Sequence, residues 1–239
     1  MTVLRIQRQD SPSAPETLRF EEFQVEDGPG DSIATALFSV RQRPVTTDGQ
    51  RVAPVAFESA CRADGCGACT LLVNGHVRPA CRTLLADARP KRGPVVLAPL
   101  SKFPLVRDLV VDRSRLRAAR KKLGAWLEEP PAAHVPLALA ELDRCTECGA
   151  CFEACPETSA GRYVGAAALN EVRLLNELAA GAPAQGRRLD ASMADGGVAG
   201  CGKAQVCIEV CPERIPLFDS ILVLQRQTTR RWLRTLLRR

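Results

Sequence analysis

The sequence has few aromatic residues and no long apolar run. Its 239 residues include two Trp, one Tyr and seven Phe, so part of the framework is expected to come from something other than aromatic packing. No apolar stretch approaches the roughly 20 residues that a membrane-spanning helix needs. Residues 1–8 show no apolar signal-peptide region. These absences predict a cytoplasmic protein that does not itself cross a membrane.

Motifs for substrate chemistry are also missing. The sequence contains no serine–histidine–acid set, phosphate-binding loop or dinucleotide fingerprint. Of the two histidines, His76 lies beside a predicted turn and is interpreted as a solvated strand residue. His134 lies in a proline-rich connection and receives no role. We therefore expect the chain to depend on a partner that carries the substrate chemistry.

Charge is concentrated at the C-terminal end. The net charge is +6, and residues 226–239 hold six arginines and no acid. The remainder is near neutral, which argues against general nucleic-acid binding. Within this basic segment, four apolar residues have helix-compatible spacing: Trp232, Leu233, Leu236 and Leu237. The segment is predicted either to lie at an anionic membrane surface or to be a solvated helix end.

The first hundred residues have the pattern of a β-rich domain. Strands are predicted around residues 4–6, 18–25 and 95–98, with a helix over 32–41 capped by Asp31 or Ser32. Asn74-Gly75 between two apolar runs predicts a β-hairpin with a type I′ turn. This arrangement predicts a β-grasp ferredoxin domain.

The chain from Arg113 onward has helical periodicity. Helices are predicted over residues 115–128, 166–180 and 217–237, and a Gly- and Pro-containing loop over 182–190. The predicted fold class is α+β, with a β-grasp domain over residues 1–109 and an α-helical ferredoxin domain with two cluster sites over 110–239.

The eleven cysteines carry most of the functional information. In a cytoplasmic protein so many cysteines are more often metal ligands than disulfides, and an odd number does not favour a closed disulfide framework. Four have the spacing C-x4-C-x2-C-x11-C, which is typical of a plant-type 2Fe–2S loop with a distant fourth ligand. They are Cys61, Cys66, Cys69 and Cys81.

Neighbouring residues support this first site. Thiolates are soft, charged donors that suit iron. Gly65 and Gly67 are expected to let the loop curl so that backbone N–H groups face the sulfurs. The predicted hairpin would return Cys81 toward Cys69. A zinc site or buried free thiols are the alternatives for these four cysteines.

Two further cysteine runs follow the bacterial ferredoxin pattern C-x2-C-x2-C-x3-C-P, in which the fourth cysteine binds the other cluster. The first run is complete: Cys145, Cys148, Cys151 and Cys155, followed by Pro156. The second has Ala204 in place of its second cysteine and otherwise consists of Cys201, Cys207 and Cys211, followed by Pro212.

The crossover rule assigns these cysteines to two sites. Cys211 completes a 4Fe–4S site with the first three cysteines of the first run. Cys155 joins Cys201 and Cys207 in a site without a fourth thiolate. A cubane corner without a ligand loses its iron most readily, so a 3Fe–4S cluster is predicted. The alternative is a 4Fe–4S cluster with water or another ligand at that corner.

The combined layout resembles the iron–sulfur subunit of succinate dehydrogenase and fumarate reductase over nearly the whole chain. Residues 60–69 resemble that family's first cluster loop, and residues 99–112 its domain linker. Residues 145–156 and 201–212 match its second and third cluster runs. Residues 163–167 resemble the helix start found in its fumarate-reductase and non-classical branch.

The resemblance implies an electron-transfer subunit of an enzyme complex. A flavoprotein partner with covalent FAD would oxidise succinate or reduce fumarate. Electrons would pass through 2Fe–2S, 4Fe–4S and 3Fe–4S clusters to quinone at a membrane anchor subunit, with or without haem. The N-terminal domain would face the flavoprotein and the C-terminal domain the anchor, which predicts a peripheral location on the cytoplasmic side of the cell membrane.

Two positions depart from many ubiquinone-using members of the family. Those members carry Trp five residues after the position of Cys155, and His directly after the position of Cys201. Here the residues are Ala160 and Gly202. The departures favour menaquinone or an unusual anchor.

Two alternatives belong to other functional classes. One is the iron–sulfur subunit of a different flavoenzyme, such as a soluble or thiol-linked fumarate reductase. The other is a free multi-cluster ferredoxin. Identifying the subunits that co-purify from native membranes would distinguish them.

Overall fold

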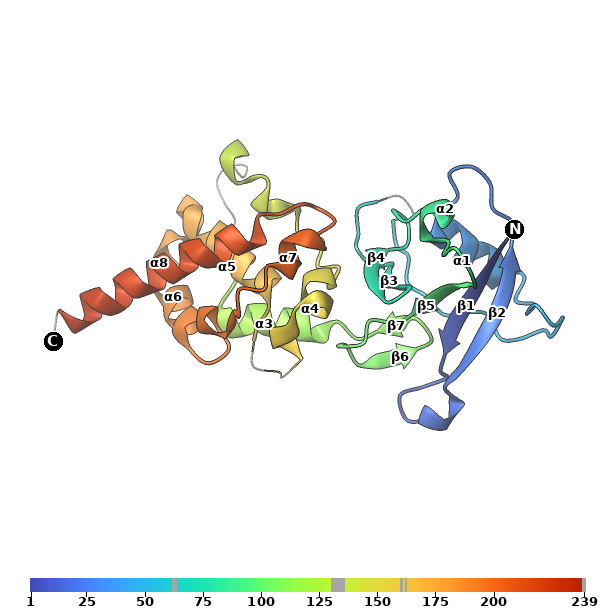
Figure 1. Cartoon of the computed structure of the whole chain (residues 1–239). Coiled ribbons are helices and arrows are strands. Elements are labelled where there is room, and N and C mark those ends of the chain that lie inside the picture. The colour runs from blue at the N-terminus through green and yellow to red at the C-terminus, as the bar shows by residue number, and fades with distance from the viewer. Residues whose placement is uncertain (62–63, 130–135, 160, 162, 238–239) are drawn as a thin grey trace. The chain divides into compact units, whose positions relative to one another are not determined.

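The computed structural model describes residues 1–61, 64–129, 136–159, 161 and 163–237. The chain divides into two compact units, Met1–Arg113 and Ser114–Arg239. The first contains a mixed sheet and the second is helical (Figure 1), which confirms the predicted α+β fold class. The sequence-based statements about Arg62, Ala63, His134, Ala160, Arg238 and Arg239 lie outside the described residues.

Five strands form the sheet of the first unit, in the order β2-β1-β5-β3-β4. Strand β1 is antiparallel to β2 and parallel to β5, and β3 is antiparallel to both β4 and β5. This is the predicted β-grasp arrangement. The strands are β1 (Thr2–Arg8), β2 (Arg19–Val25), β3 (Thr70–Val73), β4 (His76–Pro79) and β5 (Val95–Ala98).

Helix α1 (Ile33–Gln42) supplies the other side of the core of this unit. Its N-cap is Ser32, whose Oγ accepts a hydrogen bond from the backbone N–H of Thr35 at 3.2 Å. Apolar residues recur at helical spacing and are buried together with side chains of the sheet: Ile33, Leu37 and Val40 with Leu4, Ile6, Phe23 and Leu97. The short helices η1 (Pro15–Thr17) and α2 (Leu85–Ala88) lie in connections.

The β3–β4 hairpin has the predicted turn. Asn74 and Gly75 have φ values of 50° and 79°, the left-handed region that a type I′ turn requires. The Asn74 side chain also accepts a hydrogen bond from the Val96 N–H at 2.8 Å and donates one to the Ala88 carbonyl at 2.7 Å. The turn is therefore fixed to strand β5 of the same sheet.

The segment that resembles a domain linker contains a small second sheet, which the sequence analysis missed. Its strands are β6 (Leu105–Arg107) and β7 (Val110–Val111). Between them, Asp108 is buried and pairs with the buried Arg8, with 2.9 Å between Oδ1 and Nε. Its second carboxylate oxygen accepts a hydrogen bond from the Ala56 N–H at 2.9 Å. These bonds attach the segment to the first unit.

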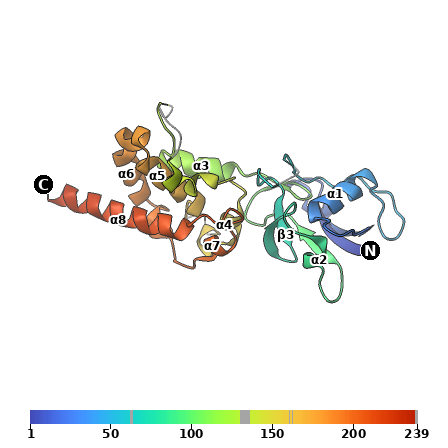
Figure 2. The same cartoon turned by 90° about the horizontal axis from the view of Figure 1, so that it is seen from above.

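Helix α5 is central to the second unit. It packs against α3, α4, α6 and α8 and contributes the fully buried Leu169 and Val172 (Figures 1 and 2). The helices are α3 (Ser114–Leu123), α4 (Ala150–Ala154), α5 (Ala166–Glu177), α6 (Gln185–Met193), α7 (Val206–Glu209) and α8 (Leu217–Leu236). Short 3-10 turns connect them: η2 (Leu137–Leu139), η3 (Leu142–Arg144), η4 (Pro156–Thr158), η5 (Ala179–Ala184) and η6 (Val198–Gly200).

The predicted loop over residues 182–190 is wrong. This stretch enters helix α6, and Pro183 lies in the preceding turn η5, where it does not interrupt the helix. Arg188 is fully buried and donates from Nε to Asn176 Oδ1 at 2.7 Å. Tertiary contacts thus stabilise a helix that composition did not favour. The helix predicted over 115–128 also ends earlier, at Leu123, because Gly124 is left-handed with φ of 64°.

Candidate metal centres

The first cysteine group lies around the β3–β4 hairpin. Cys69 directly precedes β3, and Cys81 follows β4 by two residues. The Ala80 N–H donates to the Cys69 carbonyl at 3.0 Å, which continues the pairing of the hairpin. The thiols of Cys69 and Cys81 interact, as do those of Cys61 and Cys66. The hairpin therefore brings Cys81 beside Cys69, as expected.

Backbone donors face a sulfur in this loop. The Ala68 N–H points to Cys66 Sγ at 3.4 Å. Burial raises the pKa of the Cys66 thiol, but the backbone N–H groups of Ala68 and Cys61 outweigh it and lower that pKa to about 7. Gly67 has φ of 66°, whereas Gly65 does not adopt a left-handed conformation, so only one of the two glycines meets the expectation. The loop favours the thiolate form of Cys66, whereas burial raises the pKa of Cys69 to about 11.

Side chains of this unit hold the loop in place. Arg113 Nη2 donates to the carbonyls of Ala68 at 3.0 Å and Thr70 at 3.2 Å, on either side of Cys69. Arg113 also pairs with Glu58. On the other side, Arg82 pairs with Asp64 of the loop. These arginines could not be identified from the sequence, because nothing in the cysteine spacing indicates that they reach the loop.

The second group surrounds one cavity. Its lining includes the four cysteines that the crossover rule combines, Cys145, Cys148, Cys151 and Cys211. Burial raises the pKa of the Cys145 thiol to about 11, with further contributions from the negative charges of Cys148 and Cys211. The pKa of Cys151 is raised more strongly, by burial and by the same neighbours. The cavity is otherwise mostly apolar, with Leu116, Ile215 and Leu217 on its wall.

An arginine supports the turn that carries this group. Arg120 of α3 pairs with Glu147, which lies between Cys145 and Cys148, and with Glu171 of α5 at 3.0 Å. Burial raises the pKa of Glu171, and Arg120 opposes that shift. Through Arg120, Glu147 is therefore connected to helices α3 and α5.

The third group brings Cys155 to the second run. The charges that act on the Cys207 thiol are those of Cys201 and Cys155, and burial is the main reason that its pKa rises to about 11. The same three cysteines face the hydroxyl of Tyr163. Thr158 Oγ1 donates to the Cys155 carbonyl at 2.8 Å and to the Phe152 carbonyl at 2.7 Å, which anchors the chain beside Cys155.

The two runs repeat the same backbone turn. In the first, Glu147 and Gly149 have φ values of 53° and 85°, and α4 follows. In the second, the equivalent Lys203 and Gln205 have φ values of 61° and 60°, and α7 follows. Helices α4 and α7 pack against each other. Ala204, which is exposed, therefore occupies the backbone position that corresponds to Cys148.

The chemistry of these donors fits iron–sulfur clusters. Several buried thiols that repel one another are costly to ionise together unless a cationic metal lies among them. In a cubane each thiolate binds a different iron, so the sulfurs need not converge on one point. Among the described residues, no three His, Cys, Asp or Glu side chains converge closely enough to hold a single metal ion.

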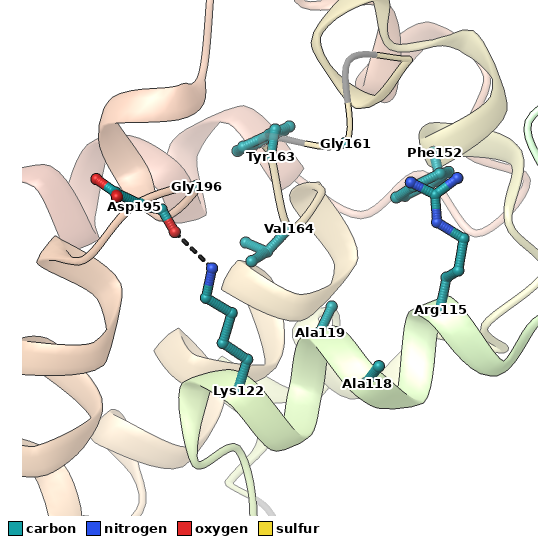
Figure 3. A pocket seen from close by; sticks show the side chains of 10 residues that line it. All are labelled: Arg115, Ala118, Ala119, Lys122, Phe152, Gly161, Tyr163, Val164, Asp195 and Gly196. Atoms are coloured by element: carbon teal, nitrogen blue, oxygen red, sulfur yellow. Dashed lines mark hydrogen bonds between the residues drawn. The ribbon is translucent and has the colours of Figure 1, made fainter.

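A groove lies beside the third group (Figure 3). Lys122 Nζ donates a hydrogen bond across the groove to the Asp195 carbonyl at 2.6 Å. The Arg115 guanidinium lies over the Phe152 ring, 5.0 Å from its centroid. Tyr163 lines the groove as well as facing the three cysteines. The lining residues are Arg115, Ala118, Ala119, Lys122, Phe152, Gly161, Tyr163, Val164, Asp195 and Gly196.

The remaining sequence-based candidates are placed as follows. His76 is exposed on β4, in agreement with its interpretation as a solvated strand residue. Gly202 is exposed, and a Cβ added there would lie 2.3 Å from Glu157 Oε1. A side chain at residue 202 would therefore displace the end of the Glu157 side chain. Within the described part of the chain, no helix is both long and apolar enough to cross a membrane.

Comparisons with known proteins agree with both units. Residues 3–118 match the family "2Fe-2S iron-sulfur cluster binding domain", and residues 141–215 match "4Fe-4S dicluster domain". A chain of the Mycobacterium smegmatis Sdh1 complex in the apo form has a TM-score of 0.75 and covers 96% of each chain. Its sequence identity is 21%, so this likeness supports the fold alone.

Two curated relatives match nearly end to end. The succinate dehydrogenase iron-sulfur subunit of Bacillus subtilis is 38% identical over 93% of this chain and 90% of its own length. The fumarate reductase iron-sulfur subunit of Wolinella succinogenes is 32% identical over 95% and 97%. The chain therefore belongs to the family of succinate dehydrogenase and fumarate reductase iron–sulfur subunits, the electron-transfer components of that oxidoreductase.

Proposed function

We propose that the chain carries electrons between a flavoprotein with covalent FAD and menaquinone at a membrane anchor subunit, through a 2Fe–2S, a 4Fe–4S and a 3Fe–4S cluster. Three observations support this proposal: two interacting pairs of thiols around the β3–β4 hairpin, four cysteines that line one cavity, and three that face the Tyr163 hydroxyl. Bound clusters supply one-electron transfer. The chain supplies thiolates, backbone donors and burial.

The ligand sets follow the three groups. Cys61 and Cys66 would bind one iron of the 2Fe–2S cluster and Cys69 and Cys81 the other, because the thiols interact in these pairs. The 4Fe–4S ligands are Cys145, Cys148, Cys151 and Cys211, and the 3Fe–4S ligands are Cys155, Cys201 and Cys207.

The choice of menaquinone rests on the surroundings of Gly202. A histidine at this position would require the Glu157 side chain to move, since a Cβ there already meets its carboxylate. Ala160 further removes the tryptophan that many ubiquinone-using members carry. A quinone site at this end of the chain would therefore lack both of those groups.

Attachment at the cytoplasmic side of the cell membrane, through an anchor subunit with or without haem, completes the proposal. Helix α8 supports it, because its last two turns expose large apolar side chains beside arginines: Trp232, Leu233, Leu236 and Leu237. A soluble flavoenzyme subunit or a free ferredoxin would not require an exposed apolar and basic surface for attachment to a membrane or an anchor.

Purification of the complex from native membranes tests the proposal. We expect a flavoprotein and an anchor subunit to co-purify, and about nine non-haem irons per chain. The oxidised complex should show a 3Fe–4S EPR signal, and stepwise reduction should reveal the other two. About four irons, or zinc in place of iron, would contradict the cluster assignment. Purification without an anchor would contradict the attachment.

A further inference from the structure

Tyr163 is the only tyrosine of the chain and is buried, with 5% of its surface exposed. Its hydroxyl has no partner within hydrogen-bond geometry among the described residues. Buried polar groups in native proteins nearly always have such a partner, so an unpaired hydroxyl at this position needs an explanation.

The groups that face this hydroxyl are the three cysteines of the third site. Burial is the main reason that the pKa of the Tyr163 hydroxyl is raised. The negative charges of Cys201, Cys155 and Cys207 raise that pKa further. Of the three thiols, that of Cys201 interacts with the hydroxyl most directly, although the pair lies outside standard hydrogen-bond geometry. The hydroxyl therefore faces sulfur atoms rather than protein oxygen or nitrogen.

The backbone holds Tyr163 in this position. The N–H of the next residue, Val164, donates to the Gly196 carbonyl at 2.9 Å. Gly165 follows with φ of 90° and starts α5, and a Cβ there would lie 3.1 Å from the Phe152 ring. The ring of Tyr163 thus lies between the groove of Figure 3 and the third site.

We propose that the Tyr163 hydroxyl donates a hydrogen bond to the Cys201 sulfur of the third cluster and thereby raises the reduction potential of that cluster. The inference rests on the proposed third cluster. A thiolate bound to iron is a charged acceptor, for which an O–H donor is well suited. Reduction adds negative charge to the sulfurs, and a donor stabilises this charge more in the reduced state.

The first test uses the wild-type complex. Oxidised samples in H2O and in D2O are compared by proton and deuteron ENDOR on the 3Fe–4S signal. We expect one strongly coupled exchangeable proton. Absence of the 3Fe–4S signal would overturn the proposed function. A normal signal without the coupled proton would overturn only the role of Tyr163.

The second test is Tyr163→Phe, which removes one oxygen and keeps the ring. We expect loss of the exchangeable coupling and a lower midpoint potential for the third cluster, with the first two unchanged. A tenfold change in its reduced-to-oxidised ratio at fixed potential would correspond to about 59 mV. Val164→Ala is the matched packing control and should retain the coupled proton. An unchanged potential in Tyr163→Phe would refute the proposal, as would an equal shift in Val164→Ala.

Discussion

Ala204 corresponds to Cys148 in the repeated turn, so a thiol at this position can restore the missing ligand. We expect Ala204→Cys to convert the third cluster toward 4Fe–4S, with loss of the 3Fe–4S EPR signal in the oxidised complex. Its potential should fall, and electron delivery to quinone should slow. Lys203→Cys places a thiol at the neighbouring exposed residue and should leave the signal intact. An unchanged signal in Ala204→Cys would show that residue 204 does not face the open corner.

Arg113 connects the first cluster loop to the rest of its unit. Arg113→Met removes the charged donor from the carbonyls of Ala68 and Thr70. We expect the first unit to lose about 1–3 kcal/mol of unfolding free energy. Guanidinium titration followed by the visible circular dichroism of the 2Fe–2S cluster measures this loss. Arg117→Met, an exposed substitution in α3, should have little effect. Equal midpoints for the two variants would show that the Arg113 bonds contribute nothing.

Single residues differ in how far their role could be predicted from sequence. The spacing of the cysteines suffices to propose their groups, because the ligand pattern is local within each run. The Ala204 prediction also follows from spacing. Tyr163 could not be predicted, since the position of its hydroxyl near the third group of cysteines depends on the tertiary fold of the second unit. Its place two residues before Gly165, which has a positive φ, was the only local signal.

Elements with strong local signals were predicted well. The Asn74-Gly75 turn and the Ser32 cap agree with the structure because each depends on adjacent residues. Helix α6 was missed because its stability comes from the buried Arg188 and its distant acceptors, including Asn176. The β6–β7 hairpin depends in the same way on the long-range pairing of Asp108 with Arg8.

Helix α8 combines two faces over its length. Leu217, Ile221 and Leu224 pack into the core of the second unit, and Thr228 is the last buried residue. Arg231 still contacts the unit through a bidentate pair with Asp190, at 2.6 Å and 2.5 Å. Beyond it, the described side chains are exposed, and all except Thr235 are apolar or basic. The helix therefore packs against its unit only as far as Arg231, and the exposed remainder is available for binding.

Removal of residues 232–239 tests this division. We expect the clusters to stay intact and sedimentation with anionic vesicles to weaken, since each lost arginine near the surface contributes on the order of 1 kcal/mol. Trp232→Ser in the full chain should weaken vesicle binding less, because it removes apolar contact with the membrane and leaves every arginine in place. If vesicle binding is unchanged while binding to membranes with the anchor falls, the segment contacts the anchor protein instead. No change in either assay would leave it as solvated surface.

Each unit of the molecule has its own core and its own cysteines. Cys66→Ala should therefore abolish the 2Fe–2S signal and leave the 4Fe–4S and 3Fe–4S signals at their usual potentials. EPR of the purified complex during a redox titration measures all three. Loss of the other two signals would show that the units are not independent in cluster assembly.

In the second unit, each cysteine run contributes one residue to the site of the other run. Cys155 lies beside the cysteines of the later run, and Cys211 lines the cavity of the earlier one. A chain cut within η5, between the two runs, would yield fragments of which neither holds a complete ligand set. The two sites would be regained together when the fragments reassociate. Because each run gives one cysteine to the other site, the two cluster sites depend on each other and form one structural unit.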